Sequence, residues 1–436
     1  MPSDARPRTP ASFKEALKFW IKLGFINFGG PAGQIAIMHQ EVVEKRGWIT
    51  EGQFLRALNF CMLLPGPEAQ QLATYIGWRL HGIPGGIAAG ALFVIPSMFI
   101  ILLLSYLAVA HIHIPVVAAA FHGIQAVVVA VVLEALLRIG KKALYHPYLY
   151  GFAAGAFIGI FFFQIPFPMV LAAAAAGGLL LQNRLPHVFC KDNFDHQSGE
   201  CRVSVVSDET ADHNRSWRHL LLVILTCFIL WAAVVGVLLI WRGYEDVLTQ
   251  IALFFTKAAF VTFGGAYAVL SYISGYAVPQ GWLTTDQMLI GLGLAESTPG
   301  PLIMVTQYIG FLGAWNLHGS APQFLNATLG ALIATYVTFL PSFLFIFVGA
   351  PFIEALAGNQ RLQAALTGVT AAVVGVILNL AVWFGLNILF PEPGHVDGFA
   401  LVTILVSFVL LRRFHLPIHA LVPLGAIAGI LWSIAR

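Results

Sequence analysis

Long apolar stretches, separated by short polar ones, make up most of the chain. Residues 87–110, 220–240 and 324–350 are nearly uninterrupted runs of apolar side chains. A helix needs about 20 such residues to cross a bilayer. Several runs contain glycine or proline, which membrane helices tolerate better than soluble helices do. The pattern therefore predicts an all-α membrane protein whose chain crosses the bilayer many times.

We expect six membrane segments before one long hydrophilic stretch, residues 183–218, and seven after it. The first six lie near residues 13–28, 55–79, 86–110, 116–137, 148–163 and 167–182. The later seven lie near residues 219–241, 251–264, 287–313, 324–350, 361–388, 399–411 and 418–434. This pattern predicts about 13 transmembrane helices, with the hydrophilic stretch as a cytoplasmic linker.

Short motifs occur twice in the same order. KLGFINFGGPAGQ (22–34) matches KAAFVTFGGAYAV (257–269), GWIT (47–50) matches GWLT (281–284), LLPGP (63–67) matches STPGP (297–301), YIG (75–77) matches YIG (308–310), and IPS (95–97) matches LPS (340–342). Residues 122–136 also match 367–381, and residues 164–170 match 415–421 more faintly. An ordered series of this kind indicates an internal duplication. We expect two homologous six-helix halves, residues 1–182 and 242–436.

Residues 219–241 have no counterpart in the first half. With six crossings in each half, this extra helix would make the halves inverted repeats, as in many secondary transporters. Lysine and arginine follow that arrangement, because the N-terminus, the 138–142 turn and the linker contain several, whereas the loops expected outside contain none. Lys45 and Arg46 disagree with this orientation unless their loop folds back among the helices.

Composition supports a membrane location and excludes several classes of function. Hydrophobic residues are 58% of the 436 residues and charged residues 10%, against about 25% charged in soluble domains. There is no basic patch for nucleic acid and no metalloprotease, serine-hydrolase or P-loop motif. The cysteines match no zinc pattern. We therefore expect neither an enzyme nor a bound metal or cofactor, and no cleavable signal is visible.

The repeated glycine and proline motifs predict helix breaks. Gly29 and Gly30 would end one helix and Pro31 would begin the next. The two Pro-Gly-Pro sequences, at residues 65–67 and 299–301, repeat this device. Backbone N–H groups at such breaks are tolerated in a membrane only where protein or water satisfies them, and helix N-termini attract anions.

If the breaks of both halves converge, they form a site for a compact, doubly charged oxyanion. Lys22 and Lys257 would supply the counter-charge, since burying an unpaired dianion is costly. The expected binding residues are Lys22, Asn27, Gly29, Gly30, Gln34, Pro65, Gly66, Pro67, Gln70, Gln71, Lys257, Thr262, Gly264, Gly265, Ser297, Thr298, Pro299, Gly300 and Pro301. In the alternative interpretation Lys22 snorkels to the interface, and the glycines only permit close helix contact.

Three carboxylates in apolar surroundings are candidates for proton coupling. They are Glu68, Glu134 and Glu296. Ionisable residues inside a membrane usually serve function, and Glu296 directly precedes a repeated helix break. Glu68 has a simpler explanation, because a carboxylate stabilises the N-terminus of its own helix.

Four sequences resemble the chromate ion transporter (CHR) family in its long, two-half form. They are FGGPAGQIAIMHQEVV, ALNFCMLLPGPEAQQLATYIGW, VTFGGAYAVLSYI and GLAESTPGPLIMVTQYIGFLGAW. The resemblance covers almost the whole chain. It implies a bacterial inner-membrane protein that exports chromate, a structural mimic of sulfate, driven by the proton-motive force and giving chromate resistance. One departure is Gln34, where the family leads us to expect histidine; glutamine cannot carry a proton there, although it can donate to an oxyanion.

The leading hypothesis is therefore a chromate exporter that works by alternating access, with one half rocking against the other. Its partners would be chromate, protons and the lipid bilayer, with sulfate as a competing anion and a homodimer left open. A sulfate or other oxyanion carrier and a channel remain alternatives. A chromate-reducing enzyme is disfavoured, since no flavin, haem or iron–sulfur signature is present.

Overall fold

The computed structural model describes residues 11–189, 194–195, 200–201, 217–263, 265–317, 322–353 and 359–435. The first half forms α1 (Phe13–Ile26), α2 (Gly30–His39), the π-helical η1 (Gln40–Lys45), α3 (Glu51–Leu63), α4 (Glu68–His111), α5 (Pro115–Ala143), α6 (Pro147–Phe161), α7 (Phe167–Leu181) and the short α8 (Pro186–Phe189). Strands β1 (Phe194–Asp195) and β2 (Glu200–Cys201) pair antiparallel within the predicted linker. Most other linker residues lie outside the described part of the chain.

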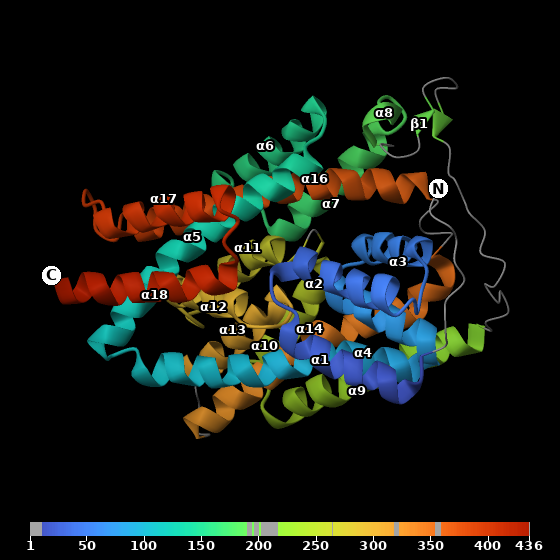
Figure 1. The fold of residues 1–436 in the computed structure, drawn as a ribbon, viewed down its shortest axis with the longest axis horizontal. Coiled ribbons are helices and arrows are strands. Elements are labelled where there is room, and N and C mark those ends of the chain that lie inside the picture. Colours follow the sequence, from blue (N-terminus) through green and yellow to red (C-terminus); the bar gives the residue numbers. More distant parts are fainter. Residues whose placement is uncertain are drawn as a thin grey trace.

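The second half follows α9 (Trp217–Trp241), which corresponds to the predicted extra helix. It contains α10 (Val247–Val261), α11 (Ala266–Ala277), α12 (Thr285–Ser297), the 3-10 turn η2 (Leu302–Met304), α13 (Val305–Asn316), α14 (Gln323–Gly349), η3 (Ala350–Phe352), α16 (Gln360–Leu389), α17 (Gly398–Arg413) and α18 (Ile418–Ala435). Both halves are helical, as predicted (Figure 1).

Six helical stretches of the described residues are long and apolar enough to cross a membrane. They are Glu68–His111, Pro115–Ala143, Leu220–Trp241, Gln323–Phe352, Gln360–Leu389 and Ile418–Ala435. Shorter apolar helices, among them α6, α7 and α10, accompany them. The chain is thus a multi-pass membrane protein, and the count of 13 crossings stays a prediction.

Two of the predicted membrane segments are divided, at the Pro-Gly-Pro sequences where helix breaks are predicted. Residues 55–79 and 287–313 were each expected as one membrane segment, but helices α3 and α12 end at Leu63 and Ser297. Both breaks fall at a Pro-Gly-Pro sequence, because proline has no N–H to continue a helix and its glycine adopts a φ of +122°. Beyond the first break, α4 continues past the expected boundary and bends at His81 and Gly82, whose backbones are not helical.

The short helices pair into antiparallel hairpins. In the first, Arg46, just after η1, forms an ion pair with Glu15 at the start of α1, with Nη1 and Oε1 3.3 Å apart. The Arg46 guanidinium also lies 5.2 Å from the ring centroid of Phe19 in α1. The 14 residues of α1 extend roughly 21 Å, less than the hydrocarbon core of about 30 Å. From α1 to η1 the chain therefore enters the membrane and returns to the same side. The sequence had indicated an interrupted membrane span for this segment.

Three further hairpins follow the same plan. Phe60 of α3 contacts Tyr75 of α4, with ring centroids 6.2 Å apart. Phe254 of α10 stacks on Tyr276 of α11 at 4.2 Å. The Asn316 side chain at the end of α13 donates to the Trp282 carbonyl just before α12, at 2.9 Å. Each half thus contributes two helical hairpins in the same order.

Corresponding positions of the halves share unusual backbone details. Gln164 and His415, which precede the last helix of each half, both have a φ of +52°. Thr50 and Thr284 each begin a helix with a capping box, made with Gln53 and Gln287 respectively. A capping box satisfies two backbone N–H groups at a helix start. The duplication read from the sequence therefore extends to local geometry.

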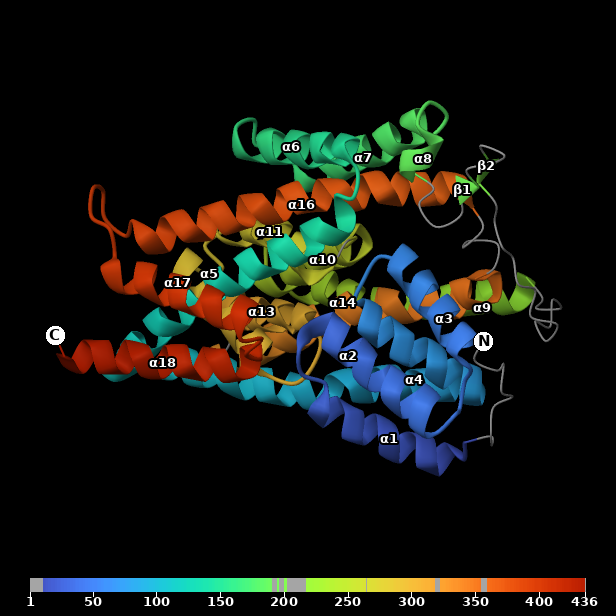
Figure 2. The same ribbon diagram turned by 45° about the horizontal axis from the view of Figure 1, so that its top comes forward.

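The last two helices of each half pack on the other half. Helices α6 and α7 lie along α16, whereas α17 and α18 lie along α5 (Figures 1 and 2). Glycines permit these close contacts: a Cβ on Gly123 of α5 would lie 1.9 Å from the Gly425 carbonyl of α18. At the corresponding position of the other contact, a Cβ on Gly368 of α16 would lie 2.4 Å from the Ala174 carbonyl of α7. Small residues at such interfaces let membrane helices approach closely.

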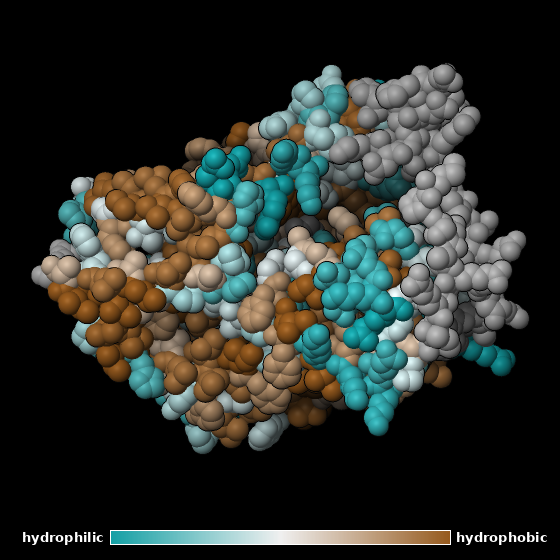
Figure 3. All heavy atoms as spheres, in the orientation of Figure 1, coloured by the Kyte–Doolittle hydropathy of each residue, from teal (hydrophilic) through white to brown (hydrophobic). Residues whose placement is uncertain are grey.

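The two ends of the molecule differ in polarity. Apolar side chains cover the end formed by α17 and α18, and hydrophilic side chains gather around α2 and α3 (Figure 3). Leu405, Ile427 and Leu431, which belong to these two helices, are more than half exposed. This distribution fits a body embedded in lipid with one polar end.

Candidate functional site

The helix breaks of the two halves meet reciprocally. We call residues 27–30 and 262–265 the first and second glycine breaks, and residues 65–67 and 299–301 the first and second PGP turns. The Gly66 N–H donates to the Thr262 carbonyl at 2.9 Å, and the Gly300 N–H donates to the Asn27 carbonyl at 3.3 Å. Each PGP turn is therefore bonded to the glycine break of the opposite half. The predicted convergence holds for the described residues; Gly264 lies outside them.

Two serines that were not among the predicted site residues complete this crossing. A Cβ on Gly66 would lie 2.9 Å from the hydroxyl oxygen of Ser342, and a Cβ on Gly300 would lie 2.4 Å from that of Ser97. Both serines are buried, and they occupy corresponding positions of the two halves. The matched IPS and LPS motifs contain them, so the repeat itself was the signal that could have identified them.

The predicted amide side chains are buried but direct their N–H groups at the protein. The Gln34 amide donates to the Asn27 carbonyl at 2.9 Å and to the Gly300 carbonyl at 2.6 Å. Gln71 donates to the Pro65 carbonyl at 2.7 Å, and Gln70 donates to the Thr74 hydroxyl at 3.1 Å. In this conformation Gln34 and Gln71 stabilise the breaks, and both N–H groups of Gln34 are engaged by carbonyls.

The predicted hydroxyl groups are engaged in the same way. The Thr262 hydroxyl donates to the Ala258 carbonyl at 2.5 Å. Ser297 and Thr298 donate to carbonyls of the last turn of α12. Backbone N–H groups at the breaks can still serve an anion, because the first N–H groups of a helix have no partner within it. Helices α2, α4 and α11 begin at these breaks without a side-chain cap.

The two predicted lysines are exposed. Lys22 acts electrostatically on Glu41 of η1, the returning arm of its own hairpin. The hydrogen bond from Lys45 holds the pKa of Glu41 below its usual range. The structure does not bring Lys22 or Lys257 into hydrogen-bond contact with the breaks, and their role stays a prediction.

Glu296 is the most buried of the three candidate carboxylates, with 6% of its surface exposed. Its carboxylate accepts a hydrogen bond from the hydroxyl of Tyr267, which follows the second glycine break. Glu134 and Arg138 of α5 form an ion pair at 3.7 Å, and both act electrostatically on Glu296. Glu296 is therefore linked to a charged face of α5.

Glu68 is the first residue of α4 and is half-buried. Lys142, one turn beyond Arg138 on α5, acts on it electrostatically. Glu134, Arg138 and Lys142 are spaced four residues apart and so share one face of α5. The corresponding residues of α16 are Asn379, Trp383 and Asn387. Charged residues of α5 therefore act on the carboxylates next to both PGP turns, whereas the corresponding positions of α16 are uncharged.

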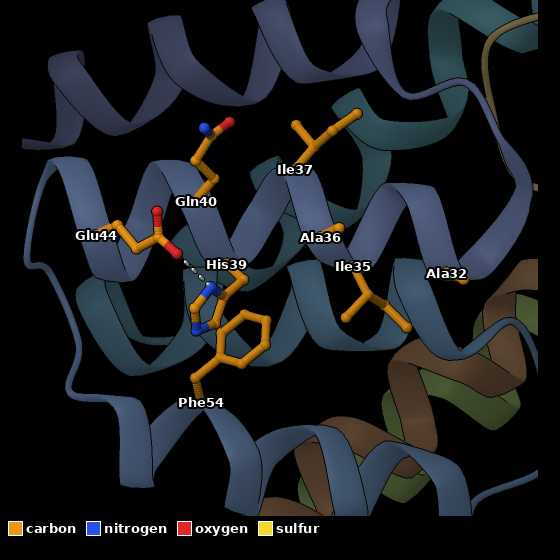
Figure 4. Close-up of a pocket in the computed structure, with 8 residues that line it drawn as sticks. All are labelled: Ala32, Ile35, Ala36, Ile37, His39, Gln40, Glu44 and Phe54. Carbon is orange, nitrogen blue, oxygen red and sulfur yellow. Dashed lines mark ion pairs between the residues drawn. The ribbon is translucent and has the colours of Figure 1, made fainter.

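An open hollow of about 540 Å³ lies along α2 (Figure 4). Its lining extends from Ala32 in the first turn of α2 to Glu44 in η1, with Phe54 of α3 opposite. His39 lies 3.3 Å from the Glu44 carboxylate and 2.6 Å from that of Glu51. The hollow therefore connects the polar end of the molecule with the start of α2, next to the first glycine break.

Paired hairpins that cross between two halves of a multi-pass helical protein are features of a membrane transporter. The sequence comparisons agree: the family model described as Chromate transporter matches residues 14–179 and 249–430. The chain belongs to this family.

Several relatives cover most of the chain. A protein of Pseudomonas aeruginosa called "Chromate transport protein" is 32% identical over 84% of this chain and 80% of its own length. A "Probable chromate transport protein" of Synechococcus elongatus is 28% identical over 97% and 96%. A "Chromate transport protein" of Cupriavidus metallidurans is 26% identical over 92% and 88%. No solved structure matches the chain.

Proposed function

We propose that the protein is a secondary transporter that exports chromate across the bacterial inner membrane, driven by the proton-motive force, and that it thereby confers chromate resistance. The family and the names of the relatives support chromate as substrate. The observation that carries the proposal is the reciprocal pair of hydrogen bonds between PGP turns and glycine breaks. It joins helix ends of both halves in one small region, the arrangement that transporters use for substrate.

The two halves are proposed to be inverted repeats, residues 1–182 and 242–436, separated by the cytoplasmic linker 183–218 and the helix at 219–241. The reciprocal packing of α6 and α7 on α16, and of α17 and α18 on α5, supports a two-fold relation between them. An odd number of crossings, about 13, would place that axis in the membrane plane.

Chromate would bind through backbone N–H groups at the breaks. Helix N-termini present N–H groups and a partial positive charge to an anion. The amides of Gln34, Gln70 and Gln71 hold this backbone in place rather than contact the substrate. Lys22 and Lys257 would balance the double charge from outside the contact shell, because two charges in a medium of low dielectric still interact over several ångströms.

Glu296 is proposed as the proton carrier. It is buried beside the second PGP turn, and its partner Tyr267 begins the neighbouring helix α11. Because Glu296 lies between two helix breaks, substrate bound at a break would change the affinity of its carboxylate for the proton. Glu134 would then influence Glu296 through the ion pair with Arg138.

Transport in everted membrane vesicles tests the function. Vesicles from cells that express the protein should accumulate radiolabelled chromate when energised and lose it when a protonophore is added. Vesicles with an inactive chain, carrying Gly300→Pro, provide the background. Excess sulfate in the same assay distinguishes a chromate transporter from a general oxyanion carrier, and a rate that fails to saturate would indicate a channel. Absence of protonophore-sensitive accumulation would refute coupled export.

A further inference from the structure

Three buried oxygen atoms around Gly300 have no hydrogen-bond partner. They are Asn27 Oδ1, Gln34 Oε1 and Ser97 Oγ. The three side chains are at most 1% exposed. All three residues adjoin the second PGP turn: the Asn27 carbonyl accepts from the Gly300 N–H, Gln34 donates to the Gly300 carbonyl, and Ser97 occupies the space that a Cβ on Gly300 would need. A buried oxygen without a partner is costly, so the cluster calls for a donor or a cation.

The orientation of these groups is fixed by their other contacts. If the Gln34 amide were turned over, its oxygen would lie 2.6 and 2.9 Å from two carbonyl oxygens, which repel it. The Asn27 amide donates to the Phe93 carbonyl at 3.4 Å. That carbonyl is the usual acceptor for a serine four residues later, so Ser97 is left free, whereas Ser105 of the same helix makes this bond at 2.6 Å.

The cluster occurs on only one side of the crossing. The counterparts of Asn27 and Gln34 in the second half are Thr262 and Val269. The Thr262 hydroxyl is satisfied by the Ala258 carbonyl, and valine has no polar atom. The backbone of the two crossings is alike, but their unpartnered oxygens differ: beside the first PGP turn they belong to Gln70 and Gln71, and the set of Asn27, Gln34 and Ser97 has no counterpart there.

From this geometry we propose that Asn27, Gln34 and Ser97 form a binding site for a sodium ion at the second PGP turn. Their oxygens are neutral, and neutral oxygens together with unwound backbone are the ligands that transporters offer to Na⁺. The described residues contain no group of three or more carboxylate, histidine or cysteine side chains that could hold a divalent metal. An anion fits this position poorly, because the two amide oxygens would repel it and both N–H groups of Gln34 are engaged by carbonyls.

The sodium site goes beyond the proposed export and can be tested without it. The purified full-length protein in detergent, without chromate, is heated in NaCl, KCl and choline chloride at equal ionic strength. We expect the Tm to rise saturably with NaCl and not with the other salts, because a ligand that binds only the folded state stabilises it. Binding of ²²Na⁺ to the same preparation should saturate at one site.

The variants are taken from the repeat itself. Gln34→Val and Asn27→Thr introduce the side chains of the second half, and Ser97→Ala removes one hydroxyl. Each should weaken ²²Na⁺ binding at least tenfold. The matched control is Ser342→Ala, which removes the corresponding hydroxyl of the other crossing and should leave binding unchanged. Should Gln34→Val fail to fold, Ser97→Ala and Ser342→Ala still form a complete comparison.

Three results would overturn the proposal. The first is a Tm that depends on pH but not on Na⁺, which would mean that a proton or water satisfies these oxygens. The second is equal stabilisation by NaCl and KCl, which would indicate a non-specific salt effect. The third is equal loss of ²²Na⁺ binding in Ser97→Ala and Ser342→Ala. Failure of chromate transport would leave these measurements unaffected, so the two proposals can fail separately.

Discussion

At the scale of residues, the proposed proton coupling depends on one buried carboxylate, that of Glu296. Its hydrogen bond from Tyr267 joins the end of α12 to the start of α11. Replacing it by glutamine keeps the shape and removes the titratable group. We expect Glu296→Gln to abolish uphill accumulation of chromate, while exchange of labelled for unlabelled chromate across the vesicle membrane continues.

Two variants make the Glu296 experiment specific. Tyr267→Phe removes the hydrogen bond and keeps the carboxylate, so it should shift the pH profile of transport without abolishing uphill accumulation. Glu134→Gln, which changes the α5 ion pair only, should have a smaller effect. If Glu296→Gln accumulated chromate as the unaltered protein does, the proton would have to travel by another group.

The lysines give a second prediction at this scale. Lys257 lies in the apolar sequence LFFTKAAF, whereas Lys22 follows Lys14 and Lys18 on one helix and can reach the interface. We expect Lys257→Ala to abolish chromate resistance at unchanged membrane level, and Lys22→Ala to reduce it less. Resistance is measured by growth in chromate, and the membrane level by immunoblot.

Arginine substitutions separate charge from shape for these positions. Lys257→Arg keeps the counter-charge and should restore part of the resistance. Full resistance in both alanine variants would show that the site needs no ammonium group.

At the scale of elements, the PGP turns depend on their glycines. Gly66 and Gly300 both have a φ of +122°, a region that costs other residues about 1–3 kcal/mol. A Cβ on Gly300 would also lie 2.4 Å from Ser97 Cβ, whereas on Gly66 it would meet the ends of the Gln71 and Ser342 side chains. We therefore expect Gly300→Ala to destabilise the protein more than Gly66→Ala, as measured by the Tm in detergent.

Gly281→Ala is the matched control for this comparison. Gly281 has a φ of +71° and open space where its Cβ would lie, so alanine there adds backbone strain of about 1–2 kcal/mol without a clash. A Tm loss for Gly300→Ala no larger than that of Gly281→Ala would mean that Ser97 can move away.

Some features of the helices were predictable from the sequence and others were not. Apolar runs predicted the long helices, and the paired motifs predicted where helices break, because proline and glycine act on the backbone locally. The reversal of the chain at Gly29 was not predicted: two left-handed glycines, with φ of +91° and +66°, suit a kink and a hairpin equally. The partner that fixes the hairpin, Arg46 with Glu15, is visible only in the folded chain.

Site residues were predictable to the extent that the repeat marks them. The breaks were found because both copies preserve them, yet the roles of the amides were not, since a sequence does not show whether Gln34 faces substrate or backbone. Tyr267 was missed for a related reason: its counterpart in the first half is Ala32, so no repeated pattern pointed to it.

At the scale of the whole molecule, the last two helices of each half pack on the other half, and this helix exchange changes the expected transport motion. Rocking of one half against the other would separate α6 and α7 from α16, and α17 and α18 from α5, where glycine contacts are closest. Packed interfaces of this kind move as units. We infer that the moving bodies combine both halves: the hairpins of the two halves form one, and the long helices α5 and α16 with their partners form the other.

The orientation of the halves can be measured directly. Phe163 and Phe414 are corresponding, exposed residues, at 72% and 68%, just before the last helix of each half. In a chain whose cysteines are replaced by serine, a membrane-impermeant maleimide applied to spheroplasts should label Phe163→Cys. Phe414→Cys should react only after the membrane is permeabilised, since inverted repeats place corresponding loops on opposite sides.

Labelling of both cysteines from the same side would rule out inverted repeats. Gln164 and His415, the adjacent residues with positive φ, are left unchanged so that the turns keep their geometry. Chromate resistance of each labelled variant shows that the substitution has not altered the fold.

The helix exchange between α5 with α17 and α18, and α16 with α6 and α7, finally bears on what the fused chain makes possible. A protein with a single repeat would end in two helices whose binding groove lies on another molecule. If the halves are inverted repeats, as proposed, such a protein could bury these helices only against a second copy inserted in the opposite orientation, so its biogenesis would require both insertion directions in equal number. Joining the copies through α9 makes that pairing intramolecular and guarantees the stoichiometry with every chain synthesised.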